Sequence, residues 1–215
     1  MLAIFDSEGV LVDGEFMPQV ARLAGNEQEV YELTNKGISG EIDWITGLHE
    51  RLELLKGISY DDCCTIANEM PIMDGAFETI SELKKLGFTI ITVSGGPDVL
   101  VKRLAKELNL DYAFCNDLIF EDNKLTNINV NVTQDKAKVV MNWFNRKFPH
   151  SLPPTDLSID TSISIVDGAN DITLFDICKL NIAFNAHEIA KINADVIINK
   201  KNLLDIMPHV RKLLS

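Results

Sequence analysis

The first twelve residues of the chain read MLAIFDSEGVLV (residues 1–12) and decide how the rest is interpreted. Residues 2–5 form a short apolar run, which is typical of a strand buried on both faces. The run ends at Asp6, and a second acid, Glu8, follows two residues later beside a glycine. In open parallel sheets, ligands bind just outside the carboxyl ends of the strands. The stretch therefore predicts a strand that brings two carboxylates to the edge of a site.

Two interpretations of these acids are open from this stretch alone. In the first, Asp6 is a covalent nucleophile and Glu8 is a proton shuttle. In the second, Asp6 only accepts hydrogen bonds from nearby backbone, as a helix N-cap or in an Asx-turn. The choice between them depends on what the other strand ends carry.

Composition narrows the class of protein. The chain has 215 residues and a formal net charge of −12, which argues against nucleic acid or an anionic membrane as a partner, because both attract basic surfaces. No apolar run approaches the ~18 residues of a membrane span, and no basic segment precedes an apolar one at the N-terminus. We therefore expect a cytoplasmic protein that acts on a small molecule, as a monomer or a homodimer.

The four cysteines give no sign of a metal site or a disulfide framework. No two of them have the CxxC spacing, and two are adjacent: Cys63, Cys64, Cys115 and Cys178. Free thiols in a reducing compartment are the expected state.

The periodicity of apolar residues divides the chain into two parts. Residues 13–73 have apolar residues at helical spacing and no strand pattern, whereas residues 74–215 alternate helices with strands. In the second part we expect strands at residues 88–93 and 112–115, a separate hairpin at 118–132, a surface loop at 146–161 and a helix that begins at Asp171. Such alternation predicts an α/β fold with a doubly wound, mostly parallel sheet. We expect residues 1–12 and 74–215 to form this core, and residues 13–73 to form an inserted all-helical cap that covers the strand ends as a lid.

Three of the predicted strands end in polar clusters that would meet at one edge of the sheet. The clusters are Asp6-Ser7-Glu8, Ser94-Gly95-Gly96 and Asp167-Gly168-Ala169-Asn170-Asp171. Asp6 and Asp167 together offer hard oxygen ligands of the kind that Mg²⁺ takes beside a substrate phosphate.

The other parts of the pattern suit a phosphate. Backbone N–H groups around Ser94 precede a predicted helix, and glycines there permit close approach of an anion. Lys136 and Lys138 are the candidate cations ahead of the third cluster. Taken singly, a Ser-Gly-Gly is more often a turn and a helical lysine is more often solvated, so the inference depends on the combination.

With these residues in view, the chain resembles a known family. The stretches FDSEGVLV, VSGG, QDKAK and VDGANDITLF resemble the four motifs of the haloacid dehalogenase superfamily of phosphatases, closest to its phosphoserine phosphatase branch, and the resemblance covers essentially the whole chain. It implies a Rossmann-like core with a helical cap. It also implies Mg²⁺-dependent hydrolysis of a phosphomonoester, O-phosphoserine first, through an aspartyl-phosphate.

The resemblance implies roles for the acids of the core. Asp6 matches the nucleophile, and Glu8 matches the acid that protonates the leaving oxygen and then deprotonates water, with its backbone carbonyl as a metal ligand. Asp167 matches the carboxylate that completes the metal site, with Asp171 close behind it.

It also implies the groups that bind substrate. Ser94 and Gly95 match phosphate contacts, Asn170 a substrate or phosphate contact, and Lys138 the motif lysine by its spacing, while the role of Lys136 stays open. In the cap, Glu15 and Arg51 match positions that hold the amino and carboxyl groups of phosphoserine, and Trp44 matches an aromatic residue that packs on substrate. Glu15 and Arg51 also suit ordinary charges on a helix surface.

Departures from the family pattern leave alternatives open. The second acid is usually Asp, and Glu8 is one methylene longer, so either its surroundings compensate for the longer reach or turnover is reduced. In both cases we expect an active enzyme. One alternative is a phosphatase or phosphotransferase for another small phosphorylated metabolite. The other is a protein that binds a phosphorylated ligand without turnover and regulates a partner.

Overall fold

The apolar run at residues 2–5 forms β1 (Leu2–Phe5), the central strand of the sheet in the computed structural model, which describes residues 1–147 and 161–215. All four residues of β1 are buried, and their side chains alternate between the two faces. Ala3 and Phe5 enter one hydrophobic core, whereas Leu2 and Ile4 enter the other. The strand is therefore buried on both faces, as its sequence predicted.

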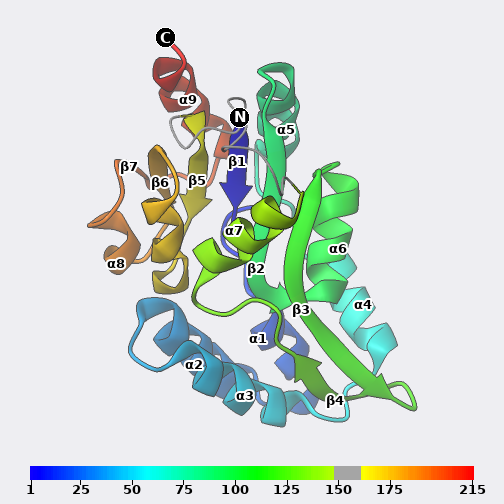
Figure 1. Cartoon of the computed structure of the whole chain (residues 1–215). Helices are drawn as coiled ribbons and strands as arrows, with labels where there is room; N and C mark the ends of the chain where they lie inside the picture. Colours follow the sequence, from blue (N-terminus) through cyan, green and yellow to red (C-terminus); the bar gives the residue numbers. More distant parts are fainter. Residues whose placement is uncertain (148–160) are drawn as a thin grey trace.

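The sheet has seven strands in the order β4-β3-β2-β1-β5-β6-β7 among the described residues (Figure 1). Every neighbouring pair is parallel except β3 and β4, which confirms the predicted doubly wound, mostly parallel α/β fold. Besides β1, the strands are β2 (Thr89–Pro97), β3 (Tyr112–Glu121), β4 (Lys124–Asn129), β5 (Ile163–Val166), β6 (Leu180–Phe184) and β7 (Val196–Ile198).

Helices cover both faces of the sheet (Figure 1). The core on the side of Phe5 contains residues of α5 (Ala76–Lys85), α6 (Asp98–Glu107), η4 (Leu203–Ile206) and α9 (Met207–Leu213). The core on the side of Ile4 contains residues of α7 (Lys136–Lys147) and of the 3₁₀ helix η3 (Ala169–Asp176). A short helix, α8 (Glu188–Lys191), joins β6 to β7.

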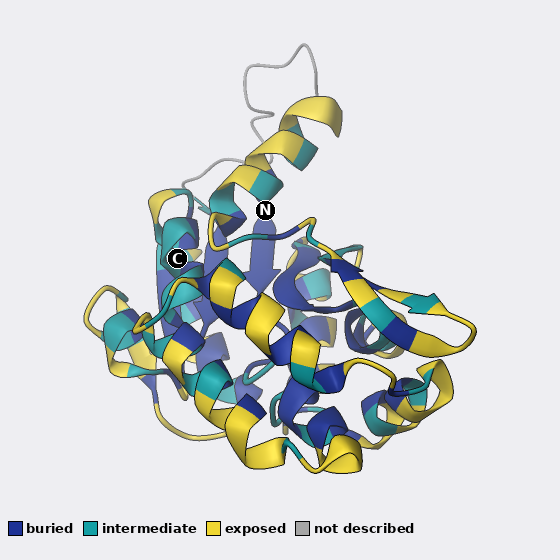
Figure 2. Ribbon diagram, turned by 90° about the horizontal axis from the view of Figure 1, so that it is seen from below, coloured by how far each residue is buried: buried dark blue, intermediate teal, exposed yellow. Residues whose placement is uncertain are grey.

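Between β1 and α5 the described structure is helical, as expected for the insertion at residues 13–73. Its elements are α1 (Phe16–Ala21), η1 (Arg22–Ala24), α2 (Glu27–Ser39), α3 (Trp44–Leu55) and α4 (Tyr60–Glu69). Figure 1 places α1, α2 and α3 beyond the carboxyl ends of β1 and β2. Seen from that side, their outer faces are largely exposed and their inner faces buried (Figure 2). The boundaries of this cap and its movement as a lid stay predictions.

Two features tie the cap to the core. The chain segments that enter and leave the cap are paired, since the backbone N–H of Asp13 donates to the carbonyl of Pro71 at 2.9 Å. The hairpin of β3 and β4 also reaches the cap, where the N–H of Gly57 donates to the carbonyl of Leu125 at 2.9 Å. The sequence predicted a short strand at residues 112–115 and a separate hairpin, but β3 is one continuous strand.

Other differences from the sequence predictions are local. The strand expected to end at residue 93 continues to Pro97, and the helix expected from Asp171 is the 3₁₀ helix η3. The loop expected at residues 146–161 lies mostly outside the described residues, although Arg146 and Lys147 belong to α7.

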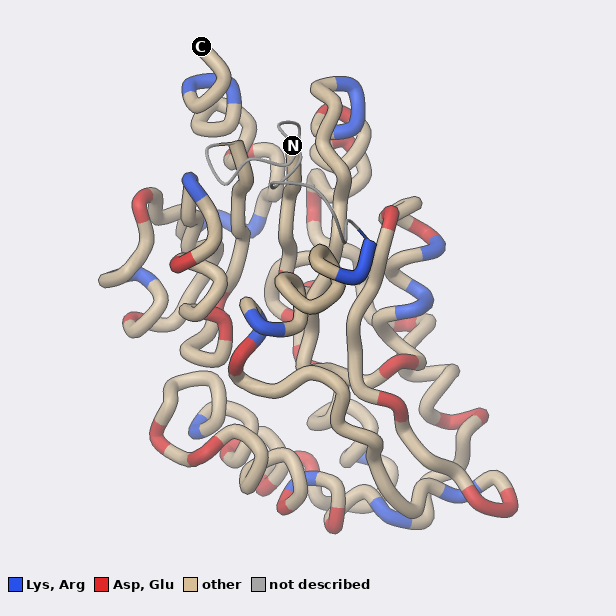
Figure 3. Tube along the Cα trace, in the orientation of Figure 1, with Lys and Arg blue, Asp and Glu red and all other residues tan. Residues whose placement is uncertain are grey.

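The surface fits the strongly negative composition. The net charge is −12, and acidic residues occur on helices of both the core and the cap (Figure 3). Among the described residues, no helix has the length and apolar character needed to cross a bilayer.

Candidate active site

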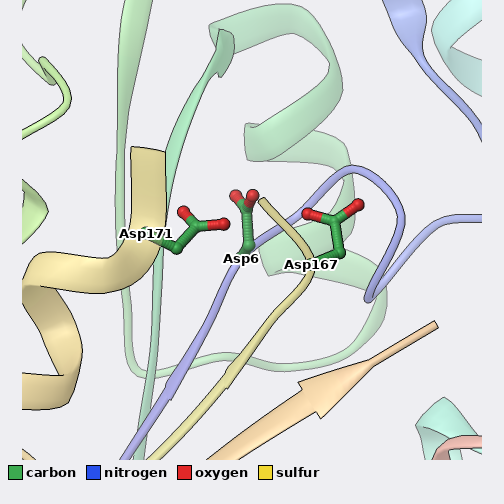
Figure 4. A group of neighbouring side chains, drawn as sticks. All are labelled: Asp6, Asp167 and Asp171. Atoms are coloured by element: carbon green, nitrogen blue, oxygen red, sulfur yellow. The ribbon is translucent and has the colours of Figure 1, made fainter. Parts of the chain in front are cut away.

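Three aspartates meet at the carboxyl edge of the sheet. Asp6 follows β1, Asp167 follows β5, and Asp171 lies in η3. Each contributes a carboxylate oxygen to a group whose atoms all lie within 4.8 Å of one another, and Figure 4 shows the carboxylate of Asp6 between the other two. The predicted meeting of Asp6 and Asp167 at one edge of the sheet is present in the structure.

The lysine that joins these acids is Lys136, not Lys138. The ammonium nitrogen of Lys136 lies 3.0 Å from Oδ1 of Asp6 and forms a second, shorter ion pair with Oδ1 of Asp171. Lys136 is fully buried, whereas the side chain of Lys138 is exposed. Two residues along an α-helix turn by about 200°, so a helix with Lys136 on its inner face carries Lys138 on its outer face.

The charges around Lys136 keep it protonated. Burial alone would lower its pKa, but the carboxylates of Asp171 and Asp6 outweigh burial and raise the pKa of Lys136. The site therefore contains a fixed positive charge within reach of a phosphoryl group on Asp6.

The two oxygens of Asp6 have different surroundings. Oδ1 accepts a hydrogen bond from the backbone N–H of Ser7 at 2.7 Å in addition to the contact with Lys136. Oδ2 receives no hydrogen bond from any described residue. The carboxylate is thus held by one oxygen and presents the other, which is what a nucleophile requires.

Asp171 and Asp167 differ in how far their carboxylate oxygens are bonded by the protein. Asp171 has both oxygens engaged, one by Lys136 and one by the backbone N–H of Gly168 at 3.0 Å. No described residue donates a hydrogen bond to the carboxylate of Asp167. Burial, followed by the charges of Asp6 and Asp171, holds the pKa of Asp167 well above its ordinary range. Negative charge therefore dominates around Asp167, although the charge of Lys136 offsets part of it.

A divalent cation would neutralise the remaining negative charge of the three aspartates. The cluster offers hard carboxylate oxygens at short range, which suits Mg²⁺ better than softer metals. Gly9 keeps this region open, because a Cβ there would lie 2.1 Å from Oδ2 of Asp167, and its φ of +72° also favours glycine. The residues present thus fit the predicted metal.

Glu8 reaches into the same region from the turn after β1. Its Oε1 accepts a hydrogen bond of 2.6 Å from the backbone N–H of Phe16, the first residue of α1. Its Oε2 lies close to Gly96, where a Cβ would be only 2.2 Å away. Burial, together with the charge of Asp6, raises the pKa of Glu8 to about 7 despite the bond from Phe16. A carboxyl group with that pKa can both donate and accept a proton near neutral pH.

A cavity of about 40 Å³, measured as the space open to the centre of a water molecule, lies between the core and the cap. The core residues that line it include Asp6, Glu8, Ser94, Gly95, Asp167 and Asn170. The cap side includes Glu15, Met17, Ile38, Trp44, Leu48 and Arg51. The predicted substrate-binding residues of core and cap therefore line one cavity.

The cap contributes one acid and one base to this cavity. Burial and the neighbouring charge of Glu8 hold the pKa of Glu15 well above its ordinary range. Arg51 has 7% of its surface exposed, and burial lowers its pKa. Both side chains line the cavity rather than an exposed helix surface, and their roles in binding stay predictions.

Trp44 closes the cavity against the core. It is the first residue of α3, and its ring lies over Gly95, where a Cβ would meet Cζ2 of Trp44 at 2.1 Å. On the core side, the hydroxyl of Ser94 accepts a hydrogen bond from the backbone N–H of Gly96 at 3.0 Å. Gly95 is therefore a point of close contact between cap and core as well as a part of the expected phosphate site.

Comparison with known proteins agrees with this geometry. Residues 1–138 match the family model of haloacid dehalogenase-like hydrolases. The chain belongs to that family. It is 34% identical over 211 residues to a phosphoserine phosphatase of Methanocaldococcus jannaschii, covering 98% of this chain and 97% of the relative.

Two solved structures are similar to this haloacid dehalogenase-like hydrolase over nearly its whole length. One is described as a "Phospho-Aspartyl Intermediate Analogue of Phosphoserine phosphatase" and the other as a substrate-bound phosphoserine phosphatase complex. Each has a TM-score of 0.88 and 32% sequence identity, and covers 97% of both chains. The fold and the family predicted from the motifs are confirmed.

Sequence reasoning left the role of Lys136 open and did not foresee two close approaches at glycines in this hydrolase. Lys136 could have been found from its helical phase, because Val140 lies one helical turn away and is buried. The close approaches at Gly9 and Gly96 had no such signal, since they depend on how the side chains of Asp167 and Glu8 are placed.

Proposed function

We propose that this hydrolase is a Mg²⁺-dependent phosphoserine phosphatase that releases serine and inorganic phosphate. The observation that carries the proposal is the content of one cavity. The core side contains Asp6 with one unbonded oxygen beside Lys136, and the cap side contains Glu15 and Arg51. A carboxylate suits an ammonium group, and a guanidinium fork suits a carboxylate, so the cap can recognise an amino acid while the core holds its phosphate.

In the first step, an oxygen of Asp6 attacks phosphorus and the bond from phosphorus to the serine oxygen breaks. The leaving oxygen takes a proton from Glu8. In the second step, water attacks the phosphorus of the aspartyl-phosphate, gives a proton to Glu8, and frees phosphate and Asp6. The reaction needs little beyond in-line positioning and neutralisation of the equatorial oxygens.

Each remaining residue has a proposed part in that positioning. Lys136 holds Asp6 and neutralises phosphoryl charge, and Asp171 holds Lys136. Ser94, Gly95 and Asn170 contact the phosphate, and Trp44 packs on the substrate and excludes water. Asp6, Asp167 and the backbone carbonyl of Glu8 would hold Mg²⁺, which supplies further charge neutralisation when bound.

Support for the aspartyl-phosphate and for the substrate comes from the described residues and from the relatives together. The geometry gives Asp6 a free oxygen, and one similar structure is named for a phospho-aspartyl analogue. The proposal also includes a cytoplasmic enzyme of serine formation. The four cysteines are free, which agrees with a reducing compartment.

The test is phosphate release from O-phosphoserine and a panel of phosphorylated metabolites, with and without Mg²⁺. We expect metal-dependent release from phosphoserine, none from the Asp6→Asn variant, and a sharply raised KM for phosphoserine in Glu15→Ala and Arg51→Ala. Release from a different metabolite alone would favour the alternative phosphatase. Tight binding of a phosphorylated ligand without release would favour the regulator.

A further inference from the structure

Arg51 is a buried cation whose hydrogen bonds are only partly made within the protein. Its Nε donates to the carbonyl of Gly47 at 3.0 Å, and its Nη1 donates to the hydroxyl of Thr34 at 3.3 Å. A guanidinium has five N–H groups in a fixed plane. In the described part of the chain, Nη2 has no hydrogen-bond acceptor, and no acid lies within ion-pair distance of Arg51. The side chain lines the cavity, so the unused edge is available to a ligand there.

Thr34 lies on α2 behind this guanidinium. The residue is 1% exposed, and its hydroxyl donates to the carbonyl of Val30 at 2.8 Å. Because that bond takes the hydroxyl hydrogen, the oxygen meets Nη1 of Arg51 with its lone pairs only. Thr34 therefore acts as a fixed acceptor whose direction is set by its own helix.

The two hydrogen bonds of Arg51 together fix the plane of the guanidinium. Gly47 belongs to α3, like Arg51 itself, so that bond fixes Nε relative to its own helix. Thr34 belongs to the neighbouring α2, and its bond to Nη1 fixes how the guanidinium plane is rotated about the end of the Arg51 side chain. Val30 of α2 and Leu48 and Leu52 of α3 are buried in the hydrophobic core, and Thr34 is a buried polar residue of α2. The Thr34 hydroxyl therefore bonds its own helix at Val30 and the guanidinium of Arg51 on the neighbouring helix.

We propose that Thr34 is a positioning residue for recognition of the substrate carboxylate. By accepting a hydrogen bond from Nη1, Thr34 orients the guanidinium of Arg51 so that its unbonded N–H groups point into the cavity. A substrate carboxylate then finds these donors already in position. The inference rests on the proposed function, because it assumes a substrate that carries a carboxylate beside its phosphate. It adds to that function a residue that touches no substrate atom.

The experiment compares Thr34→Val, which removes the hydroxyl and keeps the shape, with Thr34→Ser, which keeps the hydroxyl. We expect Thr34→Val to raise the KM for O-phosphoserine about tenfold, with a smaller change in kcat, because a hydrogen bond to a charged group is lost. Thr34→Ser should restore the wild-type KM. O-phosphoethanolamine has the amine and the phosphate but no carboxylate, so its Ki as a competitive inhibitor should be the same for both variants and for wild type.

A double-mutant cycle tests whether Thr34 acts through Arg51. If it does, Thr34→Val adds nothing to the raised KM of Arg51→Ala. Thr79→Val is the matched control, because Thr79 is buried in α5 and its hydroxyl has no partner among the described residues. It should leave the KM unchanged. Should Thr34→Val fail to fold, Thr34→Ala takes its place in every comparison.

The outcomes separate the two proposals. Two results with phosphoserine would overturn the role of Thr34: an unchanged KM in Thr34→Val, or the same rise in KM in Thr34→Ser as in Thr34→Val. Two further results would do the same: a parallel rise in the Ki of phosphoethanolamine, or a rise in KM by Thr34→Val that is as large in the Arg51→Ala background as in wild type. Each of these leaves phosphoserine as the substrate. A wild-type protein that does not hydrolyse phosphoserine would overturn the proposed function, and the role of Thr34 with it.

Discussion

The ammonium nitrogen of Lys136 lies 3.0 Å from Oδ1 of Asp6, and both groups are buried at the carboxyl edge of the sheet. The same ammonium group contacts Asp171, so it links a strand end to η3. This contact holds the carboxylate of Asp6 and places a buried positive charge beside it.

The first prediction separates the two lysines. Lys136→Met should lower phosphate release from phosphoserine by about a hundred- to a thousandfold, because it removes a preorganised charge from the reacting group. It should also destabilise the fold by about 3–5 kcal/mol, since buried carboxylates lose their partner. Lys138→Met should keep phosphate release within about twofold of wild type and change the free energy of unfolding by no more than about 0.5 kcal/mol, because the side chain of Lys138 is exposed. Steady-state kinetics and urea unfolding give the two readouts. Equal losses of activity in both variants would contradict the assignment.

Two residues show how much of the site could be predicted from the sequence alone. The position of Asp6 was predictable because the apolar run before it and the acids after it are local signals, and parallel strands bring their ends together. Motif spacing favoured Lys138 and left the role of Lys136 open, whereas helical phase favours Lys136, the lysine that contacts Asp6.

Contacts between the cap and the core could not be predicted in the same way. The placement of Trp44 over Gly95, or of Thr34 behind Arg51, depends on how α2 and α3 pack on each other and on the core. No periodicity in a single segment carries that information, because it belongs to the tertiary arrangement.

The second prediction concerns the metal. Mg²⁺ at about 100 times its Kd should stabilise the protein by about 2.7 kcal/mol and raise Tm by about 5–10 °C, because it binds the folded carboxylate cluster and relieves its repulsion. Asp167→Asn should lose most of this shift. Asp122→Asn, which removes an exposed acid in the β3–β4 turn, should keep it. Differential scanning fluorimetry with and without a chelator measures the effect. The same shift in Asp167→Asn as in wild type would place the ion elsewhere.

The third prediction concerns closure of the cap. Gly95→Ala should lower kcat/KM about ten- to a hundredfold, because its Cβ would lie 2.1 Å from Cζ2 of Trp44 and overpacking costs about 1–3 kcal/mol. A second change, Trp44→Leu, should recover part of the loss by making room. Gly37→Ala is the control, since a Cβ there meets nothing within 4 Å, and it should leave kinetics unchanged. Failure of Trp44→Leu to improve the Gly95→Ala variant would mean that the clash is not with Trp44.

The fourth prediction concerns the unusual length of the second acid. Glu8 Oε1 is held at 2.6 Å from the backbone N–H of Phe16, so the longer side chain spans the distance from the turn after β1 to the start of α1. Glu8→Asp withdraws the carboxyl group by about one methylene and breaks that bond. Because a displacement of about 1 Å can cost a hundredfold in rate, kcat should fall by about ten- to a hundredfold. Glu8→Gln keeps the length of the side chain but cannot transfer the proton, so its kcat should fall further than that of Glu8→Asp. Single-turnover kinetics would separate formation of the aspartyl-phosphate from its hydrolysis, and both steps should slow in Glu8→Asp. A Glu8→Asp variant faster than wild type would mean that the extra methylene is a handicap that the surrounding residues do not offset.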